Sequence, residues 1–204
     1  MSSAPKVFET ATSVTEPAGR PASAVAGNAH HTLGLSGGPR PWDFVLDTAP
    51  DLPLAADCEV LPLETVRERL AGQMSEGLRL LGALREAVDT PFVQLQPPPP
   101  IPSDAHLVAH PGSFKESIEA EGVLPAAVRL KLWLLESTLM REFCEARDIT
   151  WLAVPPAIVG ADGMLAAKAW SDDPARGNVW YGKKVINQLS GWLADRDTTR
   201  AGAA

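Results

Sequence analysis

Apolar residues recur every three or four positions in three long segments of the chain, and this spacing predicts amphipathic helices over residues 62–88, 124–147 and 178–196. The first begins near Pro62 and has a charged opposite face. The second is apolar over a wider arc, so we expect it to be largely buried. The predicted apolar faces comprise Val66, Leu70, Met74, Leu78, Leu81, Leu84 and Val88 in the first helix, Val128, Leu132, Leu135, Leu139 and Phe143 in the second, widened by Leu130, Trp133 and Leu134, and Val185, Ile186, Leu189 and Leu193 in the third.

Short apolar runs alternate with these helices and predict β-strands. AVAGN (24–28) is typical of the end of a buried strand, and TPFVQLQ (90–96) and TWLAV (150–154) are each followed by prolines. The resulting order is strand, helix, strand, helix, strand, helix, without the turn residues of a hairpin. This order predicts an α/β fold in three layers, with a parallel sheet flanked by helices as in flavodoxin-like proteins.

The remaining segments are rich in small residues, glycine and proline. Residues 1–23 contain few large apolar side chains and are predicted to form a disordered tail, as are residues 197–204. Residues 24–196 form one predicted α/β domain. The long connection over residues 30–62 is expected to pack onto this domain, because it contains the apolar run WDFVL. The PPPP run after the second strand predicts a stiff loop, although such a run also suits Pro-binding modules.

The composition of the 204-residue chain, 45% apolar and 21% charged, fits one globular domain. A net charge of −7 without a basic cluster argues against nucleic acid and membranes as partners. Cys58 and Cys144 are far apart in the sequence and are predicted to be free thiols, as in a reducing compartment. No apolar run suits a membrane span or a secretory signal, so we expect a cytoplasmic location.

Polar residues that follow the predicted strands are candidates for chemistry, because ligands of parallel sheets bind beyond the carboxyl ends of the strands. After the first strand, Gly27 permits close backbone approach and the Asn28 amide can donate to a developing oxyanion. The alternative is that Asn28 closes an Asx-turn and that His30 and His31 are loop residues. Adjacent histidines chelate a metal poorly, so no metal site is predicted.

The segment SDDPARGNVWYG (171–182) follows the last predicted strand. Asn178 is a natural N-cap for the last helix, and the acidic residues before it suit the positive end of the helix dipole. The segment is therefore either the rim of an active site or a polar capping turn. His106 and His110, in the loop after the polyproline run, are predicted to be surface hydrogen-bonding residues.

Taken together, GNAHHTLGLSGGPRPWDFVL and SDDPARGNVWYG resemble blocks of the SGNH (GDSL-like) hydrolase family, in a bacterial subgroup. The resemblance covers about residues 24–194. It implies a three-layer α/β domain with a parallel sheet, hydrolysis of an ester or acyl group, and no cofactor. It matches Gly27 and Asn28 to the asparagine block, with Asn28 as the oxyanion donor. It matches Asp173 to the orienting acid and Arg176 to the position of the catalytic histidine.

Two departures from the family pattern bear on activity. The strand that ends in Gly-Asp-Ser and supplies the nucleophile has no counterpart in residues 1–26, so we expect the first strand to be missing. Arg176 is permanently protonated and cannot act as the base, although His30 or His31 could replace the missing imidazole. Without a nucleophile the chain is expected to hydrolyse weakly or not at all.

Several expectations about ligands and partners follow from this resemblance. An active protein would act on a small ester or an acylated substrate, with Gly27, His30 and His31 as ligand-binding residues. The alternative is a non-catalytic binding or remnant domain from a truncated reading frame. In either case the missing first strand would leave a sheet edge exposed, through which the protein could self-associate.

Overall fold

The computed structural model describes residues 21–25, 27–35, 37–38 and 40–201. The predicted tail over residues 1–23 therefore lies almost entirely outside the described residues. At the other end, the last helix continues to Ala201, past residue 196, where the predicted domain ends.

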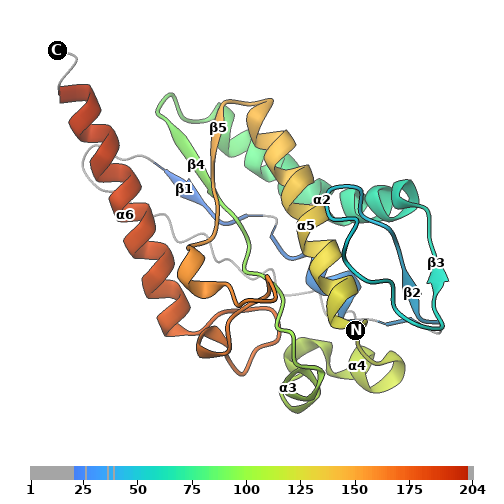
Figure 1. Cartoon of the computed structure of the whole chain (residues 1–204). Helices are drawn as coiled ribbons and strands as arrows, with labels where there is room; N and C mark the ends of the chain where they lie inside the picture. Colours follow the sequence, from blue (N-terminus) through green and yellow to red (C-terminus); the bar gives the residue numbers. More distant parts are fainter. Residues whose placement is uncertain (1–20, 26, 36, 39, 202–204) are drawn as a thin grey trace, which may run out of the picture.

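A three-stranded parallel sheet lies at the centre of the fold (Figure 1). It consists of β1 (Ala22–Ser23), β4 (Phe92–Leu95) and β5 (Ile149–Leu152), in the order β1-β4-β5. The prediction of a parallel sheet is confirmed, because β4 pairs in parallel with both of its neighbours. The first strand lies slightly earlier than the predicted AVAGN strand, since Ala22 and Ser23 are the residues that pair with β4.

Helices flank this small sheet, which gives the α/β class that the alternating pattern predicted. α2 (Leu63–Glu86) and α5 (Ala126–Glu145) lie on one side of the sheet, and α6 (Val179–Ala201) lies on the other (Figure 1). α2 and α5 begin within two residues of their predicted starts, after Pro62 and Pro125. A proline suits this position because the first helical turn does not use its N–H group.

The main core lies between the sheet and the two helices α2 and α5. Their predicted apolar faces supply most of it, although Leu84 is 39% exposed. Leu130 and Trp133 face a second, smaller cluster around Met164, which explains why α5 is apolar over a wide arc. The buried members of the main core include Phe44, Val66, Leu70, Met74, Leu81, Phe92, Val128, Leu132, Leu135, Met140 and Ile149.

The predicted apolar face of α6 is wrong in one respect. Ile186 was expected to point inward, but it is 55% exposed. Between residues 179 and 195, where burial is described, no α6 side chain is buried. The helix contacts two short 3-10 helices, η2 (Pro156–Ile158) and η3 (Ala167–Ala169), more than the strands themselves. No helix in the described part of the chain is long and apolar enough to cross a membrane.

The segments predicted as loops contain further short elements. α1 (Ala29–Gly34), β2 (Trp42–Asp43) and β3 (Glu59–Val60) lie in the connection between the first strand and α2, where β2 and β3 form a separate two-stranded parallel sheet. α3 (Asp104–Ala109), η1 (Gly112–Phe114) and α4 (Lys115–Glu121) follow the polyproline run.

A buried ion pair anchors the connection that contains β2. The Asp43 carboxylate accepts hydrogen bonds from the backbone N–H groups of Phe44 and Ala55 and lies 2.8 Å from the Lys131 ammonium of α5. Lys131 also donates to the carbonyl oxygens of Phe44 and Pro53. The pair therefore holds an irregular loop on the apolar face of α5, as the aromatic residues of WDFVL had suggested.

Candidate ligand site at the carboxyl edge of the sheet

The loops that follow the three parallel strands meet at one edge of the sheet, as parallel topology requires. At this edge α3 lies next to the segment that leads into α6 (Figure 1). The loops enclose a narrow recess that is lined by His30 and His31 after β1, Pro100 and Ile101 after β4, and Pro174 after β5, together with Arg129 of α5. The structure thus brings residues from all three predicted loops to one place.

The glycine and the asparagine of the predicted oxyanion loop have different surroundings. A Cβ atom at Gly27 would lie 2.7 Å from the Cβ of Pro97, so glycine is required by the close approach of the polyproline run. Asn28 precedes α1 and is exposed, and its side chain makes no capping hydrogen bond. The structure therefore does not bear out the alternative prediction, in which Asn28 closes an Asx-turn.

His30 is held by a carboxylate that the sequence analysis did not single out. The interpretation of His30 and His31 as loop residues is wrong, because both lie on α1 and are 1% and 3% exposed. Glu136 of α5 accepts hydrogen bonds from the backbone N–H groups of Ala29 and His30 and pairs with Nδ1 of the His30 ring. This pairing leaves Nε2 of His30 buried, without a hydrogen-bond partner among the described residues.

Such a geometry orients an imidazole as a carboxylate does in a catalytic dyad. A neutral His30 that donates from Nδ1 to Glu136 keeps a lone pair on Nε2, which is the acceptor that a general base needs. No hydroxyl or thiol in the described part of the chain hydrogen-bonds this nitrogen. Burial raises the pKa of the Cys144 thiol to about 11, which makes it a poor nucleophile.

Arg129 is the second charged residue that the sequence analysis did not single out. Its guanidinium is 2% exposed and donates to the Asp104 carboxylate at 2.8 Å and to the carbonyl oxygens of Ile101 and Pro102. Burial lowers the pKa of Arg129, and the hydrogen bond and the charge of Asp104 oppose this shift. Its Nε–H group has no hydrogen-bond partner in the part of the chain that the structure describes.

The turn that contains Asp173 and Arg176 has the geometry of a capping turn. The Asp173 carboxylate accepts from the backbone N–H of Ala175 at 2.9 Å, and its other oxygen lies 3.7 Å from Nε of Arg176. The Asn178 side chain accepts from the backbone N–H of Tyr181, as expected of an N-cap. The Arg176 side chain is 77% exposed. Neither Asp173 nor Arg176 lines the recess, although Pro174 between them does.

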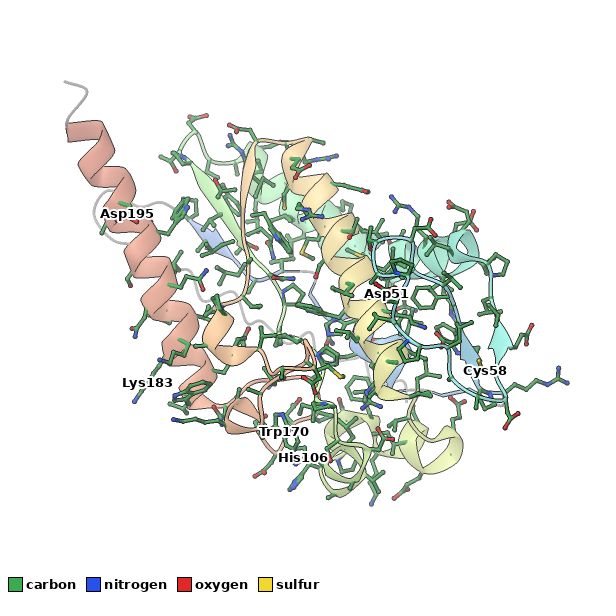
Figure 2. All side chains as sticks on the ribbon, in the orientation of Figure 1. Asp51, Cys58, His106, Trp170, Lys183 and Asp195 are labelled. Carbon is green, nitrogen blue, oxygen red and sulfur yellow. The ribbon has the colours of Figure 1, made fainter. Side chains whose placement is uncertain are left out.

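Two histidines fasten this turn to α3. Nε2 of the His106 ring lies 2.9 Å from the carbonyl oxygen of Ser171, and Nδ1 of His110 lies 3.6 Å from the Asp172 carboxylate. The His106 ring lies beside Trp170, with ring centroids 5.0 Å apart (Figure 2). The predicted hydrogen-bonding role of His106 is confirmed, but the residue lies on a helix rather than in a loop.

Three charged residues of the candidate site and the core were not predicted from the sequence, although their place on a buried helix could have indicated them. Arg129, Lys131 and Glu136 are buried on the helix that the apolar spacing predicted to be buried. Buried charges require partners, so their positions could have been recognised as candidates for ion pairs. The identity of those partners could not be read from the sequence, because Glu136 and His30 lie 106 positions apart. Among the described residues, no group of three or more His, Cys, Asp or Glu side chains is placed to hold a metal ion.

The burial of His31 predicts an acid-sensitive fold. Burial, the neighbouring His30 and Arg129, in that order, place the pKa of His31 well below its usual value of 6.5. Because unfolding restores the usual pKa, the stabilising contribution of the neutral ring is complete above pH 6.5 and is lost as the pH falls from 6.5 toward the folded-state pKa. Urea unfolding between pH 8 and pH 5 is expected to show this loss, with a slope of up to about 1.4 kcal/mol per pH unit.

The controls for this prediction are substitutions of single histidines. His31→Leu is expected to flatten the pH dependence over this range, whereas His110→Gln should leave it unchanged because His110 is on the surface. An unchanged slope in His31→Leu would show that His31 does not carry the effect.

Comparison with protein-family models, curated proteins and solved structures finds no match for this chain. The fold and the site therefore define its class. The protein is an α/β protein with a small parallel sheet flanked by helices, and its strand-end loops enclose a recess lined by buried imidazole and guanidinium groups.

Proposed function

We propose that this chain is an SGNH hydrolase-like domain of an ester- or acyl-hydrolase lineage that binds an ester or an acylated ligand and hydrolyses it weakly or not at all. The observation that carries this proposal is the exposed guanidinium of Arg176, the residue that the resemblance matches to the family's catalytic histidine. Its exposed guanidinium lies beside Asp173 and has no lone pair to accept a proton from a hydroxyl group. Asp173 therefore has a cation beside it and no base to orient.

The arrangement of the carboxyl edge supports the proposed ligand binding. Loops after three parallel strands converge there, which is where ligands of such sheets bind. The exposed Asn28 amide remains able to donate to a carbonyl oxygen that approaches from solvent. A domain of this kind can keep its scaffold and its ligand after the catalytic groups have changed.

A second candidate function is hydrolysis with His30 as the base. The specific observation in its favour is the His30–Glu136 pair, in which Nε2 of the imidazole has no hydrogen-bond partner among residues 21–25, 27–35, 37–38 and 40–201. In this candidate Glu136 is the orienting acid, and Asp173 and Arg176 have no part in the reaction. The substrate would have to enter the recess to reach His30, because the ring is 1% exposed.

Turnover of p-nitrophenyl acetate tests both candidates. We expect the purified chain to release nitrophenolate no faster than a matched sample of the unfolded protein, because the Arg176 guanidinium cannot accept a proton. Arg176→His is expected to give no gain, and Asn28→Ala and Asp173→Ala no loss. The measurement is the initial rate at 400 nm over a range of protein concentrations.

Two results would contradict the proposed weak or absent hydrolysis. Turnover that disappears in Asn28→Ala and Asp173→Ala would show that these residues form a working site. Turnover that survives both substitutions but disappears in His30→Gln would instead support the second candidate.

A further inference from the structure

An open hollow lies at the amino edge of the sheet, at the opposite end from the recess. It is formed where α2 ends before β4 and where α5 ends before β5 (Figure 1). Its lining residues are Gly82, Arg85, Glu86, Val88, Asp89 and Arg147. The hollow has about 300 Å³ of room for water-sized molecules, a volume at the lower end of the range for small-molecule sites. A small ligand therefore fits it without a movement of the chain.

Arg85 holds the two walls of this hollow together. Its guanidinium donates to the carbonyl oxygen of Val88 at 2.7 Å and to that of Arg147 at 3.3 Å, and it lies 3.8 Å from the Asp148 carboxylate. The side chain thus ties the last turn of α2 to the residues that follow α5. Because Arg85 is engaged within the protein in this way, it fixes the shape of the hollow and is not the group that a ligand meets.

Arg147 provides an oriented cation on the α5 side of the hollow. Its guanidinium carbon lies 3.8 Å from the centre of the Phe143 ring, and stacking of this kind leaves the N–H groups in the guanidinium plane open to acceptors. The side chain forms no ion pair or hydrogen bond with any residue that the structure describes. A Cβ atom at Gly82 would lie 3.8 Å from Nε of Arg147, so the glycine leaves this part of the guanidinium uncovered by α2.

Two carboxylates provide negative charge on the α2 side of the same hollow. Glu86 and Asp89 are exposed, and neither forms an ion pair with another side chain in the described part of the chain. Glu86 is also the last residue of α2, where the free carbonyl groups carry the negative end of the helix dipole. The hollow therefore has a positive wall and a negative wall whose charges do not pair with each other. Its charges are complementary to a ligand that carries both signs.

We propose that this hollow binds a free α-amino acid with an aliphatic side chain. The ligand carboxylate accepts from Arg147, its ammonium group donates to Glu86 and Asp89, and its side chain lies against Val88, which packs on the main core. At ~30 Å³ for each water-sized group the hollow holds about ten, and leucine has nine non-hydrogen atoms. The inference goes beyond the proposed function and does not depend on it, because the hollow and the recess share no lining residue.

L-Leucine is the probe for this proposal, and NMR spectra of the full chain are the readout. We expect the backbone amide signals of Gly82, Val88 and Asp89 and the Nε–H signal of Arg147 to shift in a saturable way. The dissociation constant should be on the order of 1 mM, as for a small ligand in an open site. Transfer of magnetisation should connect the methyl groups of leucine to those of Val88.

Two analogues of leucine test the need for both charges. Isocaproate has the same side chain and carboxylate but no ammonium group, and isoamylamine has the same side chain and ammonium group but no carboxylate. Each is expected to bind at least about tenfold more weakly than leucine, because it loses one set of charge-assisted hydrogen bonds. An analogue that binds as tightly as leucine would overturn the proposal and would show that the hollow takes a simple anion or a simple amine.

Substitutions on the two walls test the assignment of the charges. Arg147→Gln, and separately the double variant Glu86→Gln with Asp89→Asn, should each lower the affinity for leucine by about tenfold or more. The three side chains are exposed, so we expect these variants to fold as the wild type does. Arg141→Gln is the matched control, because it removes an exposed arginine of α5 that does not line the hollow, and it should leave the affinity unchanged.

The wild-type titration decides the proposal without any variant. Absence of a saturable shift at up to about 50 mM leucine, or shifts confined to residues outside the hollow, would each overturn it. An affinity that stays the same in Arg147→Gln would do so as well. The titration measures binding at the amino edge of the sheet and involves no turnover, so its outcome is independent of the ester assay that tests the proposed hydrolase lineage.

Discussion

Replacement of Lys131 by methionine is expected to lower the free energy of unfolding by about 3–5 kcal/mol. Lys131 and Asp43 are 1% and 0% exposed, and the substitution leaves the Asp43 carboxylate buried without its counter-charge. It also leaves the carbonyl oxygens of Phe44 and Pro53 without their donor. Urea unfolding followed by circular dichroism and by tryptophan fluorescence measures the loss.

The double variant Asp43→Leu with Lys131→Met is the matched control. Replacing both members of a buried ion pair by apolar residues is often nearly neutral, so part of the loss should be recovered. The recovery is expected to be incomplete, because Asp43 also accepts from the backbone N–H groups of Phe44 and Ala55. A loss below about 1 kcal/mol in Lys131→Met would mean that the ammonium is hydrated and that the loop does not depend on it.

Replacement of Glu136 by leucine is expected to have a similarly large effect, about 3–5 kcal/mol. The carboxylate is 0% exposed and is the acceptor for the backbone N–H groups of Ala29 and His30 and for the His30 ring. Leucine fits the apolar surroundings but leaves these donors unsatisfied. We expect α1 to detach from α5, which hydrogen exchange of the α1 amides would show together with the decrease in urea midpoint.

Two further substitutions test whether the loss of stability is specific to the Glu136 carboxylate or would follow from changing any glutamate on α5. Glu136→Gln keeps one acceptor oxygen and should lose less stability than Glu136→Leu. Glu142→Gln, on the same helix, removes an ion pair with Arg67 in which the glutamate side chain is 51% exposed, and should cost less than about 1 kcal/mol. Equal losses in Glu136→Leu and Glu142→Gln would contradict the proposed anchoring of α1 by Glu136.

The regular part of the fold was predictable because its signals are local. α2 and α5 follow from apolar residues at helical spacing, and β4 and β5 follow from short apolar runs bounded by proline. Their alternation also predicted parallel pairing, since parallel strands require a crossover between them. The missed elements α1, α3 and α4 have at most seven residues, too few for a periodic pattern to appear.

The candidate site was predictable only in its location. Parallel topology places the loops after the strands at one edge, so His30 and His31 were expected near the segment over residues 171–182. Asn28, Asp173 and Arg176 were identified from motifs, and the structure places all three outside the lining of the recess. The residues that face one another inside are instead His30, His31 and Arg129, with Glu136 behind His30.

The sequence by itself thus determined the α/β class, the two core helices, the N-cap residue Asn178 and the chemical limits of Arg176. These properties depend on local spacing, on a short hydrogen-bonded turn or on the chemistry of one side chain. The tertiary structure alone decided which charges are paired. Glu136 meets His30, and Lys131 meets Asp43, only because α5 crosses the segment between β1 and α2. Such contacts join residues about a hundred positions apart, and a buried charge gives no local sign of its partner.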